Sequence, residues 1–121
     1  VFSTGPSIPN TVRNIVQEAI ATFVLVFAIC GLSQVPELND GVGKLLVFGI
    51  IVSIGMSLGG LTGYALNPAR DLGPRIAHAI LPIKGKGSSN FKYGLIVPIF
   101  GPIIGGLLAV LLYNVIPWAA V

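Results

Sequence analysis

The stretch that decides the fold is Gly63-Tyr-Ala-Leu-Asn-Pro-Ala-Arg-Asp-Leu-Gly-Pro-Arg75, which lies between long apolar segments. Asn67 is a favourable helix N-cap, and Pro68 falls at the first helical position, where a missing N–H costs least. We therefore expect a helix that begins at Asn67 and stops near Pro82. Its length of about 14 residues, roughly 20 Å, is too short to cross a hydrocarbon core of ~30 Å. Such a helix is typical of a half-helix aimed at a pore.

The composition is that of a membrane protein. Of 121 residues, 54% are hydrophobic and 9% are charged, whereas about a quarter of the residues in a soluble domain are charged. Three segments approach or exceed the ~20 residues that a spanning helix needs. They are residues 12–33, 42–61 and 94–118. We expect a multi-pass protein embedded in a lipid bilayer, in a plasma membrane or a bacterial inner membrane.

Several classes of function are excluded by what the sequence lacks. Seven basic residues are scattered without a basic stripe or interleaved aromatics, so no nucleic-acid binding is expected. The single cysteine, Cys30, cannot form an internal disulfide, and no cysteine and histidine cluster suggests a metal. No nucleophile–base pair, carboxylate dyad or phosphate loop is present, so we expect no enzyme and no cofactor. The first ten residues lack a signal-peptide pattern, and a start at Val1 is consistent with a fragment or a processed product.

The segment 62–82 is expected to enter the membrane without crossing it. Its glycine-rich start is irregular, and irregular backbone at membrane depth must be buried in protein or line a water-filled cavity. A half-helix from one side reaches only the midplane, so a second half-helix from the opposite side would complete a path. This is the geometry of inverted-topology repeats. We therefore interpret residues 1–121 as one repeat of an all-α membrane protein.

Two further features concern the spans. Glu18 lies about two turns into the first span, where a carboxylate is expensive unless it faces the protein interior or a polar cavity. The alternative is that its side chain reaches the membrane interface near Arg13 and Asn14. Small residues repeat every four positions in the second span, which predicts close helix packing. They are Gly49, Ser53 and Ser57, and also Gly55 and Gly59.

On these residues the chain resembles the major intrinsic protein family, the aquaporins and glycerol facilitators. The most specific match is Asn67-Pro68-Ala69-Arg70. Supporting matches are Phe2-Ser-Thr4, Glu18, Thr62-Gly63, Asp71, Gly73-Pro74 and Pro98-Ile-Phe-Gly-Pro102. The resemblance covers essentially the whole chain and corresponds to the second, C-terminal repeat. It implies an aquaporin-like right-handed helical bundle of three transmembrane helices and one re-entrant half-helix.

Four positions resemble the glycerol-conducting branch of that family. Asp71 follows the signature arginine, and Arg75 lies four residues later. Pro98-Ile99 stands where water-specific members have two aromatics, and Gly55 stands where they have a constricting histidine. Tyr64 departs from the phenylalanine common in bacterial glycerol facilitators, which leaves the preferred polyol size open. The resemblance implies a passive channel for glycerol, related small neutral polyols and water that excludes ions and protons. It also implies a homotetramer of complete channels.

We expect Arg70, Tyr64 and Gly55 to form the selectivity filter. Arg70 offers five donors in a fixed fork, can bind two successive hydroxyls and repels cations by its charge. Tyr64 would offer a ring face to the carbon backbone of a polyol, and Gly55 leaves room for it. The alternative for Arg70 is a structural ion pair with Asp71 or another acid.

Asn67, Pro68 and Ala69 form the expected pore motif. If Oδ1 of Asn67 caps the helix, its NH2 group can donate to a solute oxygen and interrupt a proton-conducting chain of waters. The helix N-terminus adds about +0.5 charge there and repels protons and cations. The expected carbonyl acceptors along the path belong to Gly63, Tyr64 and Ala65.

Supporting residues are expected behind these groups. We expect Glu18 to accept hydrogen bonds from the re-entrant loop. The i, i+4 spacing of Asp71 and Arg75 allows an ion pair that shapes this loop. His78 is expected to have a structural role near the surface.

Two other functions and two partners stay open. One repeat of a secondary carrier would also use broken helices, and a non-conducting assembly subunit is a third possibility. The partner that completes the pore is either the N-terminal repeat or a second copy of this chain. Lys84, Lys86 and Lys92 predict a cytoplasmic loop by the positive-inside rule, whereas the resemblance places that loop outside. Two copies of opposite orientation could therefore pair antiparallel.

Overall fold

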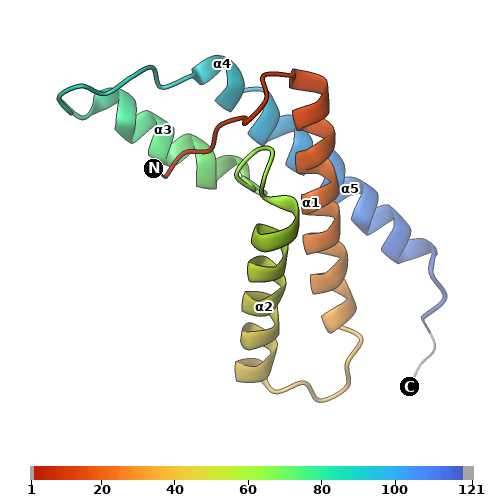
Figure 1. Ribbon diagram of the computed structural model, residues 1–121. Coiled ribbons are helices and arrows are strands. Elements are labelled where there is room, and N and C mark those ends of the chain that lie inside the picture. Colours follow the sequence, from red (N-terminus) through yellow and green to blue (C-terminus); the bar gives the residue numbers. More distant parts are fainter. Residues whose placement is uncertain (1, 119–121) are drawn as a thin grey trace.

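The computed structural model describes residues 2–118, which form helices and loops without a β-strand (Figure 1). The helices are α1 (Thr11–Leu32), α2 (Asp40–Leu58), α3 (Pro68–Ile80), α4 (Phe91–Gly94) and α5 (Val97–Val115). Three stretches are long and apolar enough to cross a membrane: Thr11–Leu32, Asp40–Leu58 and Phe91–Val115. The predicted all-α membrane fold is confirmed.

The helix ends follow local capping chemistry. α2 begins at Asp40, ahead of the predicted start at residue 42, because Oδ1 of Asn39 accepts a hydrogen bond from Gly41 N at 2.9 Å. The last apolar stretch divides into α4 and α5. Pro98 lies in the first turn of α5, where a residue without an N–H is tolerated. The chain therefore starts a new helix at Val97 instead of continuing α4.

The core of the molecule lies between α1 and α5. A Cβ atom added to Gly101 of α5 would lie 2.5 Å from Cβ of Glu18 and 3.1 Å from the carbonyl oxygen of Ile15. Gly105, one turn later, meets the backbone of Ala19 in the same way. Small residues thus let the two helix backbones approach closely, which is how helices associate in lipid.

The small-residue stripe on α2 does not pack as predicted within residues 2–118. A Cβ atom added to Gly49 would meet nothing within 4 Å. The hydroxyls of Ser53 and Ser57 donate to carbonyls of their own helix, Gly49 O at 2.8 Å and Ser53 O at 2.7 Å. Sequence spacing predicts that a stripe can pack closely, but it does not identify the neighbour.

The candidate site lies at the end of the bundle opposite the α1–α2 loop. In Figure 1, α3 extends to one side of α1, α2 and α5, and the N-terminal segment runs beside it. A loop of residues 59–67 connects α2 to α3. The N-terminal segment, this loop and α3 together hold most of the predicted site residues.

Candidate functional site

Glu18 of α1 anchors the loop that precedes α3. Its side chain is fully buried. Oε1 accepts a hydrogen bond from Ala65 N at 2.9 Å, and Oε2 accepts one from Leu66 N at 2.8 Å. A buried carboxylate is tolerated when strong donors satisfy it. The structure therefore places Glu18 inside the protein and not at the membrane interface.

The loop held by Glu18 turns sharply. Gly63, Tyr64 and Leu66 have positive φ angles of 77°, 42° and 56°. Glycine adopts this conformation readily, but a non-glycine residue there costs about 1–3 kcal/mol. The two hydrogen bonds to Glu18 and a third from Gly63 N to Gly59 O at 2.8 Å help to hold this conformation.

Asn67 caps α3. Its Oδ1 accepts from Ala69 N at 2.8 Å and from Arg70 N at 3.4 Å, and Pro68 occupies the first helical position. Asn67 is exposed, and its side-chain hydrogen bonds among residues 2–118 are made by Oδ1 and not by Nδ2. α3 contains 13 residues, so it is too short to span a bilayer. The site thus combines an exposed amide donor with the positive end of a half-helix.

At its other end, α3 is closed by a lysine. Nζ of Lys86 donates to the carbonyls of His78, Ala79 and Leu81 at 2.8, 2.7 and 2.7 Å. A cation at a helix C-terminus satisfies free carbonyls and opposes the helix dipole. His78 is 2.8 Å from the hydroxyl of Ser89 through Nδ1. Both side chains therefore secure the loop that follows α3.

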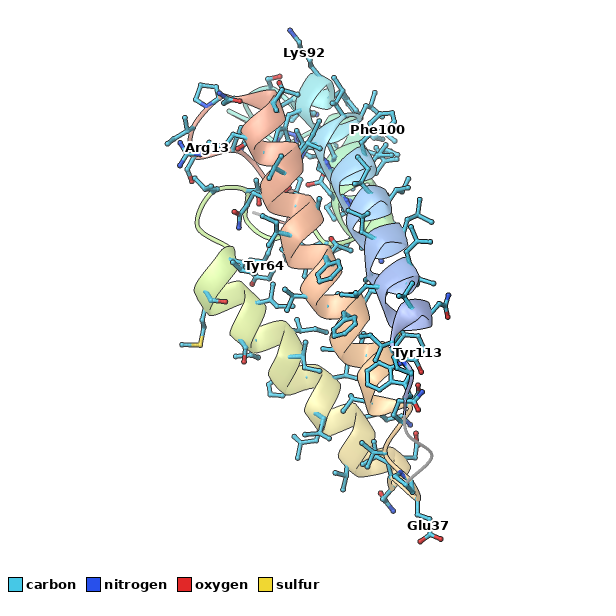
Figure 2. The ribbon with its side chains drawn as sticks, turned by 90° about the vertical axis from the view of Figure 1, so that its right-hand side faces the viewer. Arg13, Glu37, Tyr64, Lys92, Phe100 and Tyr113 are labelled. Atoms are coloured by element: carbon cyan, nitrogen blue, oxygen red, sulfur yellow. The ribbon has the colours of Figure 1, made fainter. Side chains whose placement is uncertain are left out.

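Tyr64, Arg70 and Gly55 come together in space. The guanidinium carbon of Arg70 is 5.8 Å from the centre of the Tyr64 ring. The same ring covers Gly55, where an added Cβ atom would lie 3.2 Å from Cζ of Tyr64. Tyr64 lies at the C-terminal end of α2 in Figure 2. The three predicted filter residues thus form one cluster, drawn from α2, the loop and α3.

Gly59 belongs to the same cluster but is missing from the predicted site. An added Cβ atom there would lie 2.6 Å from Cδ1 of Tyr64. The spacing of Gly55 and Gly59 was interpreted above as helix packing, whereas both glycines accommodate the Tyr64 ring. The spacing marks two glycines on one helix face, but it does not show that an aromatic ring from a loop covers them.

Asp71 and Arg75 form a buried ion pair on α3. Nε of Arg75 is 2.8 Å from Oδ2 of Asp71, and both side chains are nearly inaccessible. Arg70 does not pair with Asp71. Its Nη1 donates to the carbonyl oxygen of Phe2 at 2.8 Å. The adjacent charges on α3 therefore have separate partners.

Thr4 binds this ion pair and is also missing from the predicted site. Its backbone N donates to Oδ1 of Asp71 at 2.6 Å, and its carbonyl oxygen accepts from Nη2 of Arg75 at 2.7 Å. The sequence signal that could have identified Thr4 was the stretch Phe2-Ser-Thr4, which resembles the corresponding stretch of the family. Residues 67 positions apart carry no periodic relation, so their contact cannot be read from sequence spacing.

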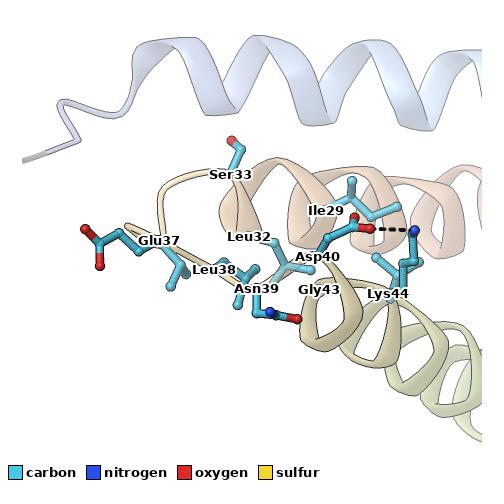
Figure 3. Close-up of a pocket in the computed structure, with 11 residues that line it drawn as sticks. Ile29, Leu32, Ser33, Glu37, Leu38, Asn39, Asp40, Gly43 and Lys44 are labelled. Carbon is cyan, nitrogen blue, oxygen red and sulfur yellow. Dashed lines mark hydrogen bonds and ion pairs between the residues drawn. The ribbon is translucent and has the colours of Figure 1, made fainter.

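A hollow lies at the other end of the bundle (Figure 3). It has a volume of about 650 Å³ between the end of α1 and the start of α2. Its charged pair, Asp40 and Lys44 at 2.6 Å, is exposed to solvent. The hollow contains none of the predicted site residues. Residues 2–118 also contain no group of three His, Cys, Asp or Glu side chains that could hold a metal.

Known proteins resemble the chain over nearly its whole length. A sequence model of the family described as major intrinsic protein matches residues 3–113. The glycerol uptake facilitator protein of Bacillus subtilis is 59% identical over 114 residues, which are 94% of this chain and 41% of that protein. A glycerol uptake facilitator protein of Streptococcus pneumoniae is 54% identical over 113 residues, 93% of this chain and 47% of the relative.

A third relative has a different printed name. The D/L-lactic acid transporter of Lactiplantibacillus plantarum is 43% identical over 109 residues, which are 90% of this chain and 45% of that protein. The chain therefore spans about half the length of the curated relatives it matches.

Proposed function

This chain belongs to the major intrinsic protein family, and we propose that it supplies half of a membrane pore for glycerol, related small neutral polyols and water. The pore excludes ions and protons. The observation that carries the proposal is the cluster of Tyr64 and Arg70 over Gly55, beside the exposed amide of Asn67. Two relatives named glycerol uptake facilitator support glycerol as the solute. Facilitators of this family are channels and not enzymes, in agreement with the predicted absence of catalysis.

The filter binds the two sides of a polyol differently, with polar groups for its hydroxyls and an apolar surface for its carbon chain. Arg70 retains donors beyond the one bound to Phe2 O, and these can reach two neighbouring hydroxyls. The Tyr64 ring offers an apolar surface to the carbon chain. Gly55 and Gly59 let the ring lie back against α2, which leaves width for carbon-bound hydrogens. The fixed positive charge of Arg70 repels a hydrated cation and so raises the electrostatic barrier to its entry.

The start of α3 blocks the passage of protons through the pore. Oδ1 of Asn67 is occupied by the helix cap, so the amide presents Nδ2 as a donor. A water or hydroxyl oxygen has two acceptor sites, and this bond occupies one of them, so the oxygen keeps only one site for a proton from the next water in the file. The positive end of α3 opposes cations at the same depth. The carbonyls of Gly63, Tyr64 and Ala65 provide acceptors along the approach.

A complete pore requires a second repeat. The segment 62–82 reaches the membrane interior from one side only, and the relatives are about twice as long as this chain. The partner is the N-terminal repeat or a second copy in the opposite orientation. Complete channels then assemble as homotetramers, each protomer with its own pore.

A solute-uptake assay tests the proposal. Liposomes are prepared with the chain alone and with a chimera in which the chain replaces the matching 114 residues of the Bacillus subtilis relative. Stopped-flow light scattering follows entry of glycerol, sorbitol and lactic acid. We expect fast glycerol entry whose rate does not saturate. Uptake by the chain alone would support pairing of two copies.

Other outcomes would replace the proposal. Saturable uptake coupled to an ion gradient would indicate a carrier. Faster entry of lactic acid than of glycerol would assign the solute named for the Lactiplantibacillus plantarum relative. A folded chimera without any flux would favour a structural assembly subunit.

The role of Arg70 is tested in the same chimera. Arg70→Ala removes the donors and the charge, so we expect the glycerol-to-sorbitol rate ratio to fall about tenfold and a sodium leak to appear. Lys84→Ala removes an exposed positive charge outside the filter and is the control. Unchanged glycerol, sorbitol and sodium rates in the Arg70 variant would exclude Arg70 from the filter.

A further inference from the structure

We infer that Thr4 is a positioning residue that holds Arg70 in its filter geometry. The inference rests on the proposed channel function. Thr4 lies in the N-terminal strap, which is defined here as residues 2–4. This strap runs along α3 and binds two adjacent α3 residues, Arg70 and Asp71, at two separate points.

The first point is Thr4 itself, which uses all of its polar groups. Its backbone N and its hydroxyl donate to Oδ1 of Asp71 at 2.6 and 2.7 Å. Its carbonyl oxygen accepts from Nη2 of Arg75 at 2.7 Å. Thr4 is buried, and each of these bonds involves a charged partner. Charge-assisted bonds are about twice as strong as neutral ones.

The second point is the carbonyl oxygen of Phe2, which accepts from Nη1 of Arg70 at 2.8 Å. Phe2 and Thr4 are two residues apart, so the chain between them spans at most about 7 Å. We therefore expect a displacement of Thr4 to shift the Phe2 carbonyl as well. That carbonyl is the hydrogen-bond acceptor of the Arg70 guanidinium among residues 2–118. The orientation of the guanidinium is thereby linked to the bonds of Thr4.

The ion pair gives the strap a rigid base. Arg75 donates to both oxygens of Asp71, at 2.8 and 2.9 Å, and also to the Ser89 carbonyl at 2.7 Å. Arg75 therefore holds both carboxylate oxygens of Asp71 independently of Thr4. Thr4 also lies against the loop before α3, because a Cβ atom added to Gly63 would be 3.5 Å from Cβ of Thr4. The hydroxyl group of Thr4 is thus held in one place between α3 and this loop.

The test separates the hydroxyl from the shape of the side chain. Thr4→Val keeps the shape and removes the bond to Asp71, whereas Thr4→Ser keeps the hydroxyl. Ser7→Ala is the matched control, because the Ser7 hydroxyl, in the same N-terminal segment, donates to Gly60 O at 2.7 Å, in the loop before α3 and not in α3 itself. All variants are made in the chimera with the Bacillus subtilis relative.

Two measurements are made on each variant. The first is the glycerol-to-sorbitol rate ratio, which we expect to fall about fivefold in Thr4→Val and to change less than about twofold in Thr4→Ser and Ser7→Ala. The second is the rate at which phenylglyoxal modifies Arg70, mapped by mass spectrometry. We expect this rate to rise about threefold in Thr4→Val, because the guanidinium has lost its fixed acceptor.

The outcomes of these two measurements support or overturn the positioning role of Thr4. A folded Thr4→Val variant with unchanged rate ratio and unchanged Arg70 reactivity overturns it. If the parent chimera passes no glycerol, the proposed function fails, and Arg70 reactivity alone decides whether Thr4 positions this residue. If Thr4→Val does not fold, Thr4→Ala is measured in its place, because it removes the hydroxyl without placing a methyl group against the Asp71 carboxylate. Equal losses in Thr4→Val and Thr4→Ser would also overturn the role of the hydroxyl.

Discussion

The α1–α5 bundle and the α3 region are held together by different forces. Small residues of α5, such as Gly101 and Gly105, lie against the backbone of α1. The α3 region is held by hydrogen bonds to the buried charged side chains of the described residues, Glu18, Asp71 and Arg75. Close packing depends on shape, whereas these hydrogen bonds fix direction. The α3 region, which must hold the donors of Asn67 and Arg70 at set positions, is the region that the buried charges hold in place.

The largest effect is expected where the two regions meet, at Glu18. Glu18→Gln replaces one carboxylate oxygen by an NH2 group that faces a backbone N–H, of Ala65 or Leu66. We expect a loss of about 2–4 kcal/mol in the free energy of unfolding, and loss of glycerol entry. Unfolding in detergent and stopped-flow uptake measure the two quantities.

The matched control for that change is its neighbour. Gln17→Leu removes a side-chain bond from Nε2 to Leu58 O at 2.6 Å and leaves the loop before α3 anchored. We expect it to keep glycerol selection. If the two variants lose selection equally, the hydrogen bonds of Glu18 have no special role in the α3 region.

A smaller effect is expected from breaking the bundle alone. In Gly105→Ala, the new methyl group would meet the Ala19 backbone, with Cα at 2.9 Å, so the helices must separate. We expect a destabilisation of about 1–3 kcal/mol, with the glycerol-to-sorbitol ratio unchanged in the folded fraction. Gly106→Ala is the control, because its nearest neighbour, Cγ2 of Val26, would be at an ordinary 3.8 Å. Equal unfolding midpoints for the two variants would refute this account of helix packing.

The smallest effect is expected at the edge of the α3 region. Gly55→Ala places a methyl group 3.2 Å from the Tyr64 ring, which must shift away from Gly55 by a few tenths of an ångström. We expect sorbitol entry to fall about threefold and glycerol entry to fall less, because a narrower path excludes the larger polyol first. Gly49→Ala on the same helix, with no neighbour within 4 Å, should change neither rate. A rise in sorbitol entry in the Gly55 variant would place Tyr64 outside the solute path.

Much of the fold follows from local sequence signals. Apolar length predicts the spanning helices, because a bilayer requires a minimum number of apolar residues. The Asn67-Pro68 pair predicts the start of α3, because capping depends on adjacent residues. The i, i+4 spacing of Asp71 and Arg75 predicts their contact, which the structure contains at 2.8 Å.

Contacts across long sequence separations required the tertiary structure. Gly55 and Gly59 share a helix face by spacing, but only the folded loop shows that Tyr64 covers both. Likewise, nothing in the sequence around Thr4 indicates that it binds Asp71, which lies 67 positions away. The sequence predicted that the small residues of α2 pack closely, yet it could not identify which of them have a neighbour.

The sequence by itself thus determined the helical class, the apolar stretches and the cap that starts α3, because each depends on residues within one or two turns. Tertiary structure alone decided that Thr4 binds Asp71, that Phe2 holds Arg70 and that Tyr64 rests on two glycines. The physical reason is the directionality of these contacts. A hydrogen bond or a ring contact forms only when packing has already brought both partners to within a few ångströms in the correct orientation.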